Sequence, residues 1–347
     1  MWKLISYSKV KIPLRPYLSN YVIGVVENEQ GKRLIVQVDK KINKIKVGQI
    51  GIVENTVGPK GEIKAFYLRK KSNKADKDQS VKFKKIKTLG VIGAGKMGCQ
   101  LAQIAAKSGI KVILKSRTKK SINKALKNID KELGKNILTT TKFDKLKKAE
   151  LIIENIIENK VAKQNLFKQL EQVVDNKTIL ATNTSSLLVD NLSAKMKNSK
   201  RLIGIHFFSP IDKMPLVEII ANKKTDQLII KKIVKFIERL SKVPIVVKDS
   251  PGFVVNRLLF NLINEAAYLI EEGEVKVHQV DEAMRLGANH PMGPLQLADL
   301  IGIDLTYEII KNLNTSIIGF KPPANIFKKM INAGKMGRKT KSGFYDY

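Results

Sequence analysis

Two polar residues stand within apolar, strand-like runs of the sequence. His206 lies in "IGIHFFSP" and is one of three histidines in 347 residues. Glu218 lies in "PLVEII", just after the turn-like "SPIDKMP" that follows the histidine. An imidazole can accept and return a proton near neutral pH, and a carboxylate can hold it in one tautomer. If the two runs form adjacent strands, they create a general acid–base couple. The competing interpretation is a half-buried structural histidine and a surface glutamate on an edge strand.

Hydroxyl and amide side chains occur at two other places that bear on this couple. Ser185 lies in "ATNTSSL", where a predicted strand ends, and Asn256 lies in "PGFVVNRLL", near the start of a predicted helix. Ligands of α/β proteins bind at the carboxyl ends of the strands. We therefore expect Ser185 and Asn256 to take part in the same site as His206.

Three glycines with G-x-G-x-x-G spacing mark a second site. They follow the buried-strand pattern "TLGVIG" and open the helical pattern "AGKMGCQLAQIAAKSG", after which "KVILKS" indicates a second strand. In such a unit the first glycine permits the turn, the second admits a pyrophosphate, and the third lets helix pack on strand. The amides of the helix start then face the phosphates. This pattern predicts a dinucleotide-binding loop made of Gly93, Ala94, Gly95, Lys96, Met97 and Gly98.

The end of the second predicted strand bears on which dinucleotide binds. An acidic residue there usually accepts hydrogen bonds from the adenosine ribose and selects NAD. Here Ser116 is followed by Arg117, Lys119 and Lys120. A serine and a guanidinium both suit the oxygens of a 2′-phosphate. We predict that NADP(H) is favoured and that NAD(H) is still accepted, the alternative being a chance cluster in a lysine-rich chain.

The pattern of strands and helices divides the chain into parts. Residues 1–72 contain short β-rich runs between turns, which predict a small all-β barrel or sandwich. Residues 73–84 are polar and charged and predict a linker. Strands and helices alternate over residues 85–250, as in a doubly wound α/β domain of the Rossmann type. Residues 251–347 show helical periodicity and predict an all-helical C-terminal domain.

The composition excludes several classes of protein. There are 64 Lys and Arg against 31 Asp and Glu, a net charge of +33, but the excess is spread along the chain. We therefore expect no specific nucleic-acid binding, although the positive field favours anionic ligands such as nucleotides and coenzyme A esters. One cysteine excludes an internal disulfide and a cysteine-based zinc site, and we expect no metal. No apolar run reaches the ~18 residues of a membrane span, so we expect a cytoplasmic protein.

Seven motifs occur in order along residues 85–347. They are "GVIGAGKMG", "LIIENIIENK", "ILATNTSSL", "HFFSP…MPLVEII", "KDSPGFVVNRLL", "GANHPMGPLQLADLIGIDL" and "GRKTKSGFYDY". Together they resemble the L-3-hydroxyacyl-CoA dehydrogenase family, and "GANHPMGPL" is most similar to its 3-hydroxybutyryl-CoA branch. The resemblance implies reversible hydride transfer between a (S)-3-hydroxyacyl-CoA and NAD(P), yielding a 3-ketoacyl-CoA. It implies that His206 is the general acid/base and Glu218 its partner.

The resemblance also assigns roles to other residues. Ser185 and Asn256 would hold the 3-oxygen and the thioester region of the substrate, and Glu158 and Lys163 would lie along the cofactor. Ser209 stands where the family usually has asparagine, and it can still form a hydrogen bond to the substrate.

Other parts of the chain differ from the family pattern or stand outside its chemistry. Ser116 and Arg117 stand where the family usually has an aspartate. The segment between "KVILKS" and "AELIIENI", which contacts coenzyme A in the family, is short here, and we assign no coenzyme A residues to it. His290 lies in a loop motif without a proton role, and His278 is expected on the surface at the start of a helix.

The N-terminal part carries a separate resemblance. The piece "NYVIGVVENEQGKRLIVQV…KIKVGQIGIVEN" is similar to the OB-fold domain that accompanies acyl-CoA-handling enzymes, often beside thiolases. It implies docking of a thiolase-type partner, the alternative being a stabilising cap. The dehydrogenase family forms homodimers through its helical domain, which we also expect here. Two other functions stay open: a dehydrogenase of another 3-hydroxy acid, and a non-catalytic scaffold that binds coenzyme A or nucleotide.

Overall fold

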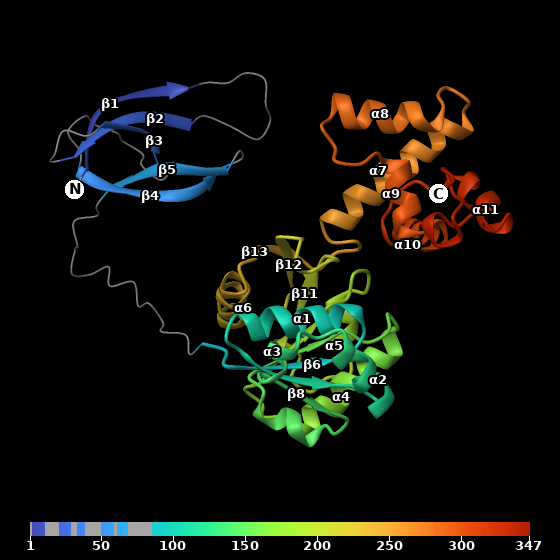
Figure 1. The fold of residues 1–347 in the computed structure, drawn as a ribbon, viewed down its shortest axis with the longest axis horizontal. Coiled ribbons are helices and arrows are strands. Elements are labelled where there is room, and N and C mark those ends of the chain that lie inside the picture. Colours follow the sequence, from blue (N-terminus) through green and yellow to red (C-terminus); the bar gives the residue numbers. More distant parts are fainter. Residues whose placement is uncertain (1, 11–20, 29–32, 39–49, 59–60, 69–84) are drawn as a thin grey trace. The chain divides into compact units, whose positions relative to one another are not determined.

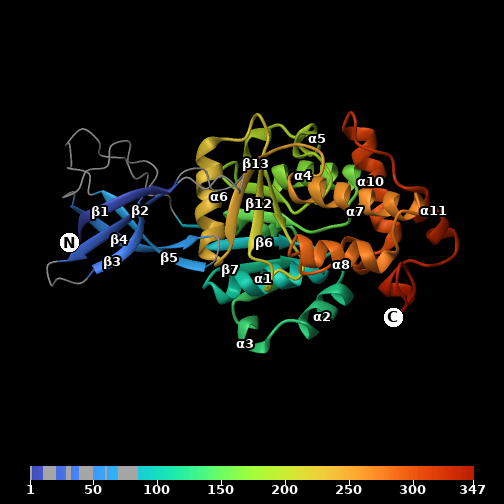
Figure 2. The ribbon, with the colours of Figure 1, turned by 90° about the horizontal axis from the view of Figure 1, so that it is seen from above.

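The computed structural model describes the chain apart from residues 1, 11–20, 29–32, 39–49, 59–60 and 69–84. Side chains are described for residues 85–130 and 132–347. The chain divides into two compact units, Met1–Lys82 and Phe83–Tyr347, which are shown in Figures 1 and 2. The segment 73–84, expected to be a linker, lies outside the described residues.

The first unit contains a closed five-stranded barrel in the order β1-β2-β3-β5-β4. Neighbouring strands are antiparallel except β3 and β5, which are parallel. The pairs Trp2↔Gly51 and Lys3↔Ile50 close the barrel between its first and fourth strands. Closure leaves no free sheet edge that another chain could extend. The strands are β1 Trp2–Val10, β2 Tyr21–Asn28, β3 Arg33–Val38, β4 Ile50–Gly58 and β5 Gly61–Leu68.

The second unit is built on an eight-stranded sheet in the order β13-β12-β11-β10-β9-β6-β7-β8. The strands from β8 to β11 are parallel, whereas β12 is antiparallel to β11 and parallel to β13. The chain order reverses between β6 and β9, so a crevice opens at their carboxyl ends. The strands are β6 Thr88–Ile92, β7 Lys111–Lys115, β8 Ile137–Thr140, β9 Leu151–Glu154, β10 Ile179–Thr182, β11 Leu202–Phe207, β12 Leu216–Ala221 and β13 Val243–Lys248.

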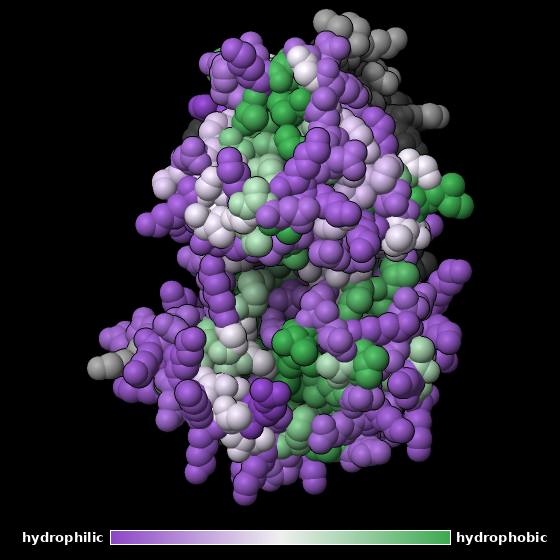
Figure 3. Space-filling view, turned by 90° about the vertical axis from the view of Figure 1, so that its right-hand side faces the viewer, coloured by the Kyte–Doolittle hydropathy of each residue, from purple (hydrophilic) through white to green (hydrophobic). Residues whose placement is uncertain are grey.

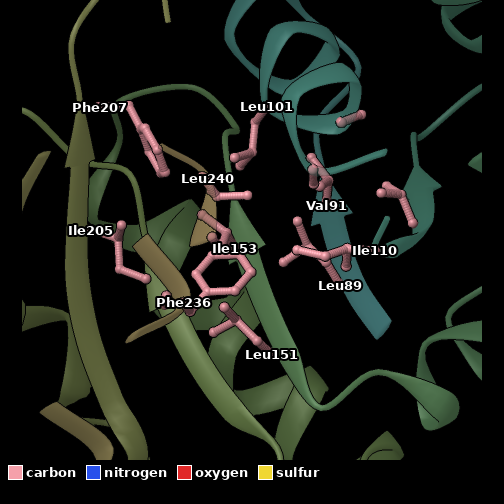
Figure 4. Packing of buried hydrophobic residues seen from close by; sticks show 14 of the residues in the cluster. Leu89, Val91, Leu101, Ile110, Leu151, Ile153, Ile205, Phe207, Phe236 and Leu240 are labelled. Carbon is pink, nitrogen blue, oxygen red and sulfur yellow. The ribbon is translucent and has the colours of Figure 1, made fainter. Parts of the chain in front are cut away.

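Helices cover both faces of this sheet (Figure 1). Alternate residues of β9 point to opposite faces, as side chains of a strand must. Leu151 and Ile153 join the core under α1 and α6 (Figure 4), and Ile152 joins the core under α4. Each fully buried side chain of this kind contributes about 1.5–3 kcal/mol. The helices are α1 Lys96–Lys107, α2 Lys119–Lys127, α3 Lys131–Gly134, α4 Lys160–Val173, α5 Val189–Ser193 and α6 Gln227–Arg239.

The C-terminal part is helical and has its own core. Apolar residues such as Phe260, Ile263, Leu295 and Phe327 are buried together there. Among the described residues, no helix is long and apolar enough to cross a membrane. The helices are α7 Val255–Glu271, α8 Val277–Gly287, α9 Pro294–Ile301, α10 Ile303–Ser316 and α11 Asn325–Asn332.

Two buried aspartates fasten the end of the chain to these helices. Asp281 accepts hydrogen bonds from the amides of Leu295 (2.8 Å) and Gln296 (2.9 Å) at the start of α9, and from the hydroxyl of Tyr345 (2.8 Å). Asp299 accepts from the amides of Phe344 and Tyr345, both at 2.9 Å. The C-terminal segment is thereby part of the helical fold.

Candidate active site

The paired strands β11 and β12 bring His206 and Glu218 together. The two residues are direct partners in the strand register, and Nδ1 of His206 lies 2.8 Å from Oε2 of Glu218. Both are buried, with 5% of His206 and 1% of Glu218 exposed. Because an ionised carboxylate can only accept, Nδ1 carries the proton and Nε2 of the neutral ring is left with a lone pair.

The second oxygen of Glu218 ties the couple to the helical part of the unit. Oε1 accepts hydrogen bonds from the amides of Val254 (3.1 Å) and Val255 (3.0 Å) at the start of α7. Burial by itself raises the pKa of Glu218, but the hydrogen bonds from His206 and from these amides outweigh it and hold the pKa below its usual range. Glu218 is therefore ionised near neutral pH and can stabilise an imidazolium.

Aromatic rings form the walls around the imidazole. The ring centroid of His206 lies 4.5 Å from that of Phe208 and 5.7 Å from that of Phe253. Among the described residues, Nε2 of His206 has no hydrogen-bond partner. The couple thus has one nitrogen fixed by a carboxylate and the other available for proton transfer.

Ser185 and Asn256 meet although 71 positions separate them in the sequence. Nδ2 of Asn256 donates to the carbonyl oxygen of Ser185 at 3.0 Å, and both residues are half-buried. Ser209 is exposed, two residues beyond the end of β11. The four predicted catalytic residues therefore come from β11, β12, the end of β10 and the start of α7.

Sequence reasoning missed Asn183. Its Oδ1 accepts from the amide of Phe207 (2.9 Å), next to His206, and its Nδ2 donates to Oδ1 of Asn155 (2.7 Å). This amide side chain therefore links the ends of β9, β10 and β11. Its only signal in the sequence was its place in "ATNTSSL", two residues before Ser185.

The glycine-rich loop has the geometry that a dinucleotide requires. Gly93 has φ +103°, and a Cβ there would overlap the carbonyl of Asn155. A Cβ on Gly98 would overlap the carbonyl oxygen of Gly93, which shows how closely α1 packs on the loop. At Gly95 a Cβ would meet nothing within 4 Å, and no side chain caps the start of α1. This open backbone fits a pyrophosphate group.

A cavity of about 1100 Å³ extends from this loop along the ends of β6, β7 and β9. Ala94, Lys96, Ser116 and Arg117 line it, whereas Met97 packs against the apolar core. Figure 3 shows one face of the molecule, on which hydrophobic side chains gather around a hollow. The volume and the mixed polar and apolar walls suit a nicotinamide dinucleotide.

A lysine that sequence reasoning did not single out also lines this cavity. Lys115 ends β7, is 7% exposed, and has its Nζ 3.7 Å from the ring centroid of Phe143. Burial lowers the pKa of Lys115. Arg117 next to it is exposed. The cavity is therefore lined by four cationic side chains, those of Lys96, Lys115, Arg117 and Lys124, and by no carboxylate among the described residues.

Glu158 and Lys163 do not line the cavity. Lys163 is 1% exposed, and its Nζ lies 2.7 Å from Oε1 of Glu154, a buried residue that sequence reasoning did not single out. Nζ also lies 3.3 Å from Oε2 of Glu158. The structure thus brings these two residues to each other and to the Ser185 segment. His278 is exposed in the first turn of α8, and His290 is half-buried in the loop after α8.

Two family models match the chain. The first model, described as "3-hydroxyacyl-CoA dehydrogenase, NAD binding domain", matches residues 88–250. The second model, described as "3-hydroxyacyl-CoA dehydrogenase, C-terminal domain", matches residues 252–347.

Individual proteins show the same similarity. The 3-hydroxybutyryl-CoA dehydrogenase of Clostridioides difficile is 42% identical over 277 residues, which cover 75% of this chain and 99% of that protein. Human mitochondrial hydroxyacyl-coenzyme A dehydrogenase is 34% identical over 308 residues, covering 81% and 98%. The crystal structure of (S)-3-hydroxybutyryl-CoA dehydrogenase from Ralstonia eutropha has a TM-score of 0.72 at 36% identity and covers 76% of this chain and 99% of its own.

Proposed function

The chain belongs to the 3-hydroxyacyl-CoA dehydrogenase family and is a nicotinamide-dependent oxidoreductase, and we propose that it interconverts (S)-3-hydroxybutyryl-CoA and acetoacetyl-CoA. The observation that carries the acid–base chemistry is the His206–Glu218 couple, whose Nε2 is free while Nδ1 is held at 2.8 Å. The short acyl chain is supported by relatives of that name and by the motif "GANHPMGPL".

In the proposed mechanism His206 moves the proton of the 3-hydroxyl group. During oxidation Nε2 accepts this proton, and Glu218 stabilises the imidazolium that forms. During reduction the imidazolium returns the proton to the 3-oxygen. When bound, the nicotinamide supplies the hydride acceptor or donor at its C4. Phe208 and Phe253 confine the ring of His206 so that Nε2 keeps one direction.

We propose that Ser185 and Asn256 hold the 3-oxygen and the thioester region of the substrate, with Ser209 as a further hydrogen-bonding group. Their support is the contact between Asn256 and the Ser185 backbone near the couple, at 3.0 Å. The same contact joins the sheet to α7, so substrate would bind where the two parts of this unit meet.

We propose that the cofactor is preferentially NADP(H), with NAD(H) accepted. Ser116 and Arg117 line the cavity at the end of β7, where an aspartate would select the free ribose. Lys115 adds a second cation on the Phe143 ring. A 2′-phosphate carries negative charge that these groups would balance.

For the rest of the chain we propose the organisation inferred from the sequence. Residues 1–72 would be an OB-like domain, supported by the strand order β1-β2-β3-β5-β4, and residues 73–84 a linker. This domain would dock a thiolase-type partner and raise the effective concentration of one active site near the other. The helical domain, residues 251–347, would form a homodimer. We propose the cytoplasm, since a chain with one cysteine has no internal disulfide that would need an oxidising compartment.

A steady-state assay tests the proposed reaction. The purified full chain is given acetoacetyl-CoA with NADPH and separately with NADH, and free 3-hydroxy acids with the oxidised cofactors. We expect kcat/KM for the coenzyme A ester to exceed that for any free acid by at least about 100-fold. Comparable turnover of a free 3-hydroxy acid would contradict the substrate assignment.

A further inference from the structure

The end of β11, which carries His206, is held by β12 on one side and by an amide side chain on the other. We propose that Asn183 and Asn155 are positioning residues, which fix the end of β11 relative to the dinucleotide-binding loop and thereby place His206 for proton transfer. This inference rests on the proposed function, in which His206 moves the proton of the 3-hydroxyl group.

The backbone ladder between β10 and β11 stops before the catalytic residue. The last paired residues are Thr182 and Gly204, two positions before His206. On the opposite side, β12 continues to pair with β11 through His206 and Phe207. On the β10 side, the amide of Phe207 donates instead to Oδ1 of Asn183 at 2.9 Å. A side chain, and not a neighbouring strand, therefore holds the last residue of β11 on this side.

The backbone donor decides how both amide side chains are oriented. A backbone N–H can only donate, so the atom of Asn183 that faces Phe207 is the oxygen. Nδ2 of Asn183 then donates to Oδ1 of Asn155 at 2.7 Å, and Nδ2 of Asn155 donates to the carbonyl oxygen of Ile153 at 3.4 Å. Exchanging oxygen and nitrogen in either side chain would place two donors or two acceptors face to face. The network therefore has one arrangement.

Asn155 has a fixed place against the dinucleotide-binding loop. It lines the cavity, and its backbone amide donates at 2.6 Å to the carbonyl oxygen of Ile92, the residue before the first glycine of the loop. Its own carbonyl lies so close to Gly93 that a Cβ on this glycine would overlap it. Through Asn183 this fixed place is connected to the end of β11.

The connection matters because the proton and the hydride leave or reach neighbouring atoms of one substrate. The loop places the cofactor, whereas β11 places Nε2 of His206. Glu218 fixes the direction of the imidazole through Nδ1 at 2.8 Å, but it belongs to β12, on the side of β11 away from the loop. The two amide side chains supply the contact on the loop side. An error of 1 Å in such positioning can reduce a rate by about 100-fold.

Substitutions in the full chain test the network. Asn183→Ala removes both hydrogen bonds of this side chain, whereas Asn183→Asp keeps the acceptor for Phe207 and loses the donor to Asn155. Asn155→Ala leaves Asn183 without its second partner. Asn222→Ala is the matched control, because Oδ1 of Asn222 also accepts a backbone amide, that of Lys224 at 2.8 Å, in the turn after β12.

Two measurements are made on each variant: steady-state kinetics with acetoacetyl-CoA, and amide hydrogen exchange at Phe207, which needs no turnover. We expect Asn183→Ala to lower kcat by roughly 10–100-fold, with KM for acetoacetyl-CoA and the cofactor dissociation constants within about threefold of wild type. Exchange at Phe207 should rise by at least about tenfold. Asn183→Asp should recover most of the exchange protection and part of kcat, and Asn222→Ala should change none of these values.

A double-variant cycle tests whether the two residues act as one network. If Asn155 acts through Asn183, the variant with alanine at both positions should have a kcat within about twofold of that of Asn183→Ala, because the first substitution has already broken the connection. Losses that multiply would show that the two side chains act independently and would overturn the network.

A wild-type kcat in folded Asn183→Ala would also overturn the proposal. So would a loss of cofactor affinity of about tenfold with an unaltered kcat, because that pattern identifies a cofactor ligand. If Asn183→Ala does not fold, Asn155→Ala decides, and an unchanged kcat there contradicts the network. If wild type itself turns over no acyl-CoA, the proposed function fails, and exchange at Phe207 still decides whether Asn183 holds the end of β11.

Discussion

Glu218 and Asp299 are both buried carboxylates that accept two backbone amides, yet their pKa values move in opposite directions. Both are 1% exposed. At Glu218 the hydrogen bond from His206 and two amides outweigh burial and lower the pKa. At Asp299 burial dominates over the amides of Phe344 and Tyr345, and the negative charge of Asp281 adds to it, so the pKa is raised. Amide and hydroxyl donors thus do not offset the effect of burial on the pKa of Asp299, whereas the imidazole of His206 together with two amides does so at Glu218.

The two carboxylates differ in their roles. Glu218 belongs to the proposed catalytic site, whereas Asp299 stabilises the fold. Glu218 faces an imidazole whose second nitrogen is free. The negative charge of Glu218 can therefore stabilise the imidazolium that forms when this nitrogen accepts a proton. Asp299 faces backbone amides and the hydroxyl of Tyr347 at 3.1 Å, none of which gains a proton near neutral pH. Its contribution is to hold the end of the chain on the helical core.

The largest expected effect follows from removing the imidazole. In His206→Gln the carboxylate of Glu218 keeps its amide donors but loses the titratable partner, which makes it similar to Asp299. We expect kcat for acetoacetyl-CoA reduction to fall by about 100-fold or more, the usual scale for an acid–base group. The dissociation constants of NADPH and NADH, measured by fluorescence, should change by less than about twofold. Retention of most of the turnover would refute the assigned role.

The next effect concerns a charge that is exposed. Arg117 lies at the end of β7 and lines the cavity, whereas Glu218 is enclosed. Arg117→Asp should repel a 2′-phosphate and accept hydrogen bonds from ribose hydroxyls, so kcat/KM should fall about tenfold or more for NADPH and rise for NADH. Lys119→Asp is the control, because Lys119 is not among the residues that line the cavity. Equal or better wild-type efficiency with NADH would contradict the proposed preference.

A smaller effect tests the comparison of the two carboxylates directly. Glu218→Gln and Asp299→Asn should each lower the free energy of unfolding by about 1–3 kcal/mol, since a buried acceptor is lost. Their pH dependences should be opposite. A lowered folded pKa gives stability that is present above the unfolded pKa and is lost in acid, so the cost of Glu218→Gln should shrink as pH falls below about 4.5.

A raised folded pKa has the reverse consequence. The contribution of Asp299 is greatest below its unfolded pKa and is lost as pH rises through the folded pKa, so the cost of Asp299→Asn should shrink as pH rises above about 3.8. Urea unfolding of both variants and wild type between pH 3.5 and 7 measures the two slopes. Slopes of the same sign would show that the partner of a carboxylate does not decide its charge state here.

The sequence predicted what depends on local pattern or on neighbouring strands. The glycine loop follows from three residues in one turn, and the pairing of His206 with Glu218 from two strands joined by a short connection. Glu154 could not be found in this way, because in "LIIEN" it differs in no local respect from a strand-end glutamate. Its partners Lys163 and Thr182 are set by the packing of α4 and β10 on the sheet.

Other contacts that the sequence did not predict join separate elements of the fold. Lys163 stays a predicted cofactor residue, but its contact with Glu154 inside the protein could not be predicted from the sequence. The clamp of Asp299 on residues 344–347 spans more than 40 positions and carries no period or motif spacing. Such contacts depend on how α9 and the chain end pack together, and no single segment encodes that.

The smallest effect is expected from removing the first unit. Both carboxylates, His206, Ser185 and Asn256 belong to the second unit, Phe83–Tyr347. A chain of residues 85–347 should fold and reduce acetoacetyl-CoA within about twofold of the full-length rate, while losing co-purification with a thiolase-type partner. A folded truncation without activity would instead assign the first unit to the substrate site.

The most direct test of the central claim is the pH dependence of the wild-type enzyme in both directions. If His206 gives and takes the proton, oxidation of 3-hydroxybutyryl-CoA needs neutral imidazole and reduction of acetoacetyl-CoA needs imidazolium. We predict that kcat/KM rises with pH for oxidation and falls with pH for reduction. The residual activity of His206→Gln should lose both dependences. Slopes of the same sign in the two directions, or slopes that persist in His206→Gln, would contradict the account.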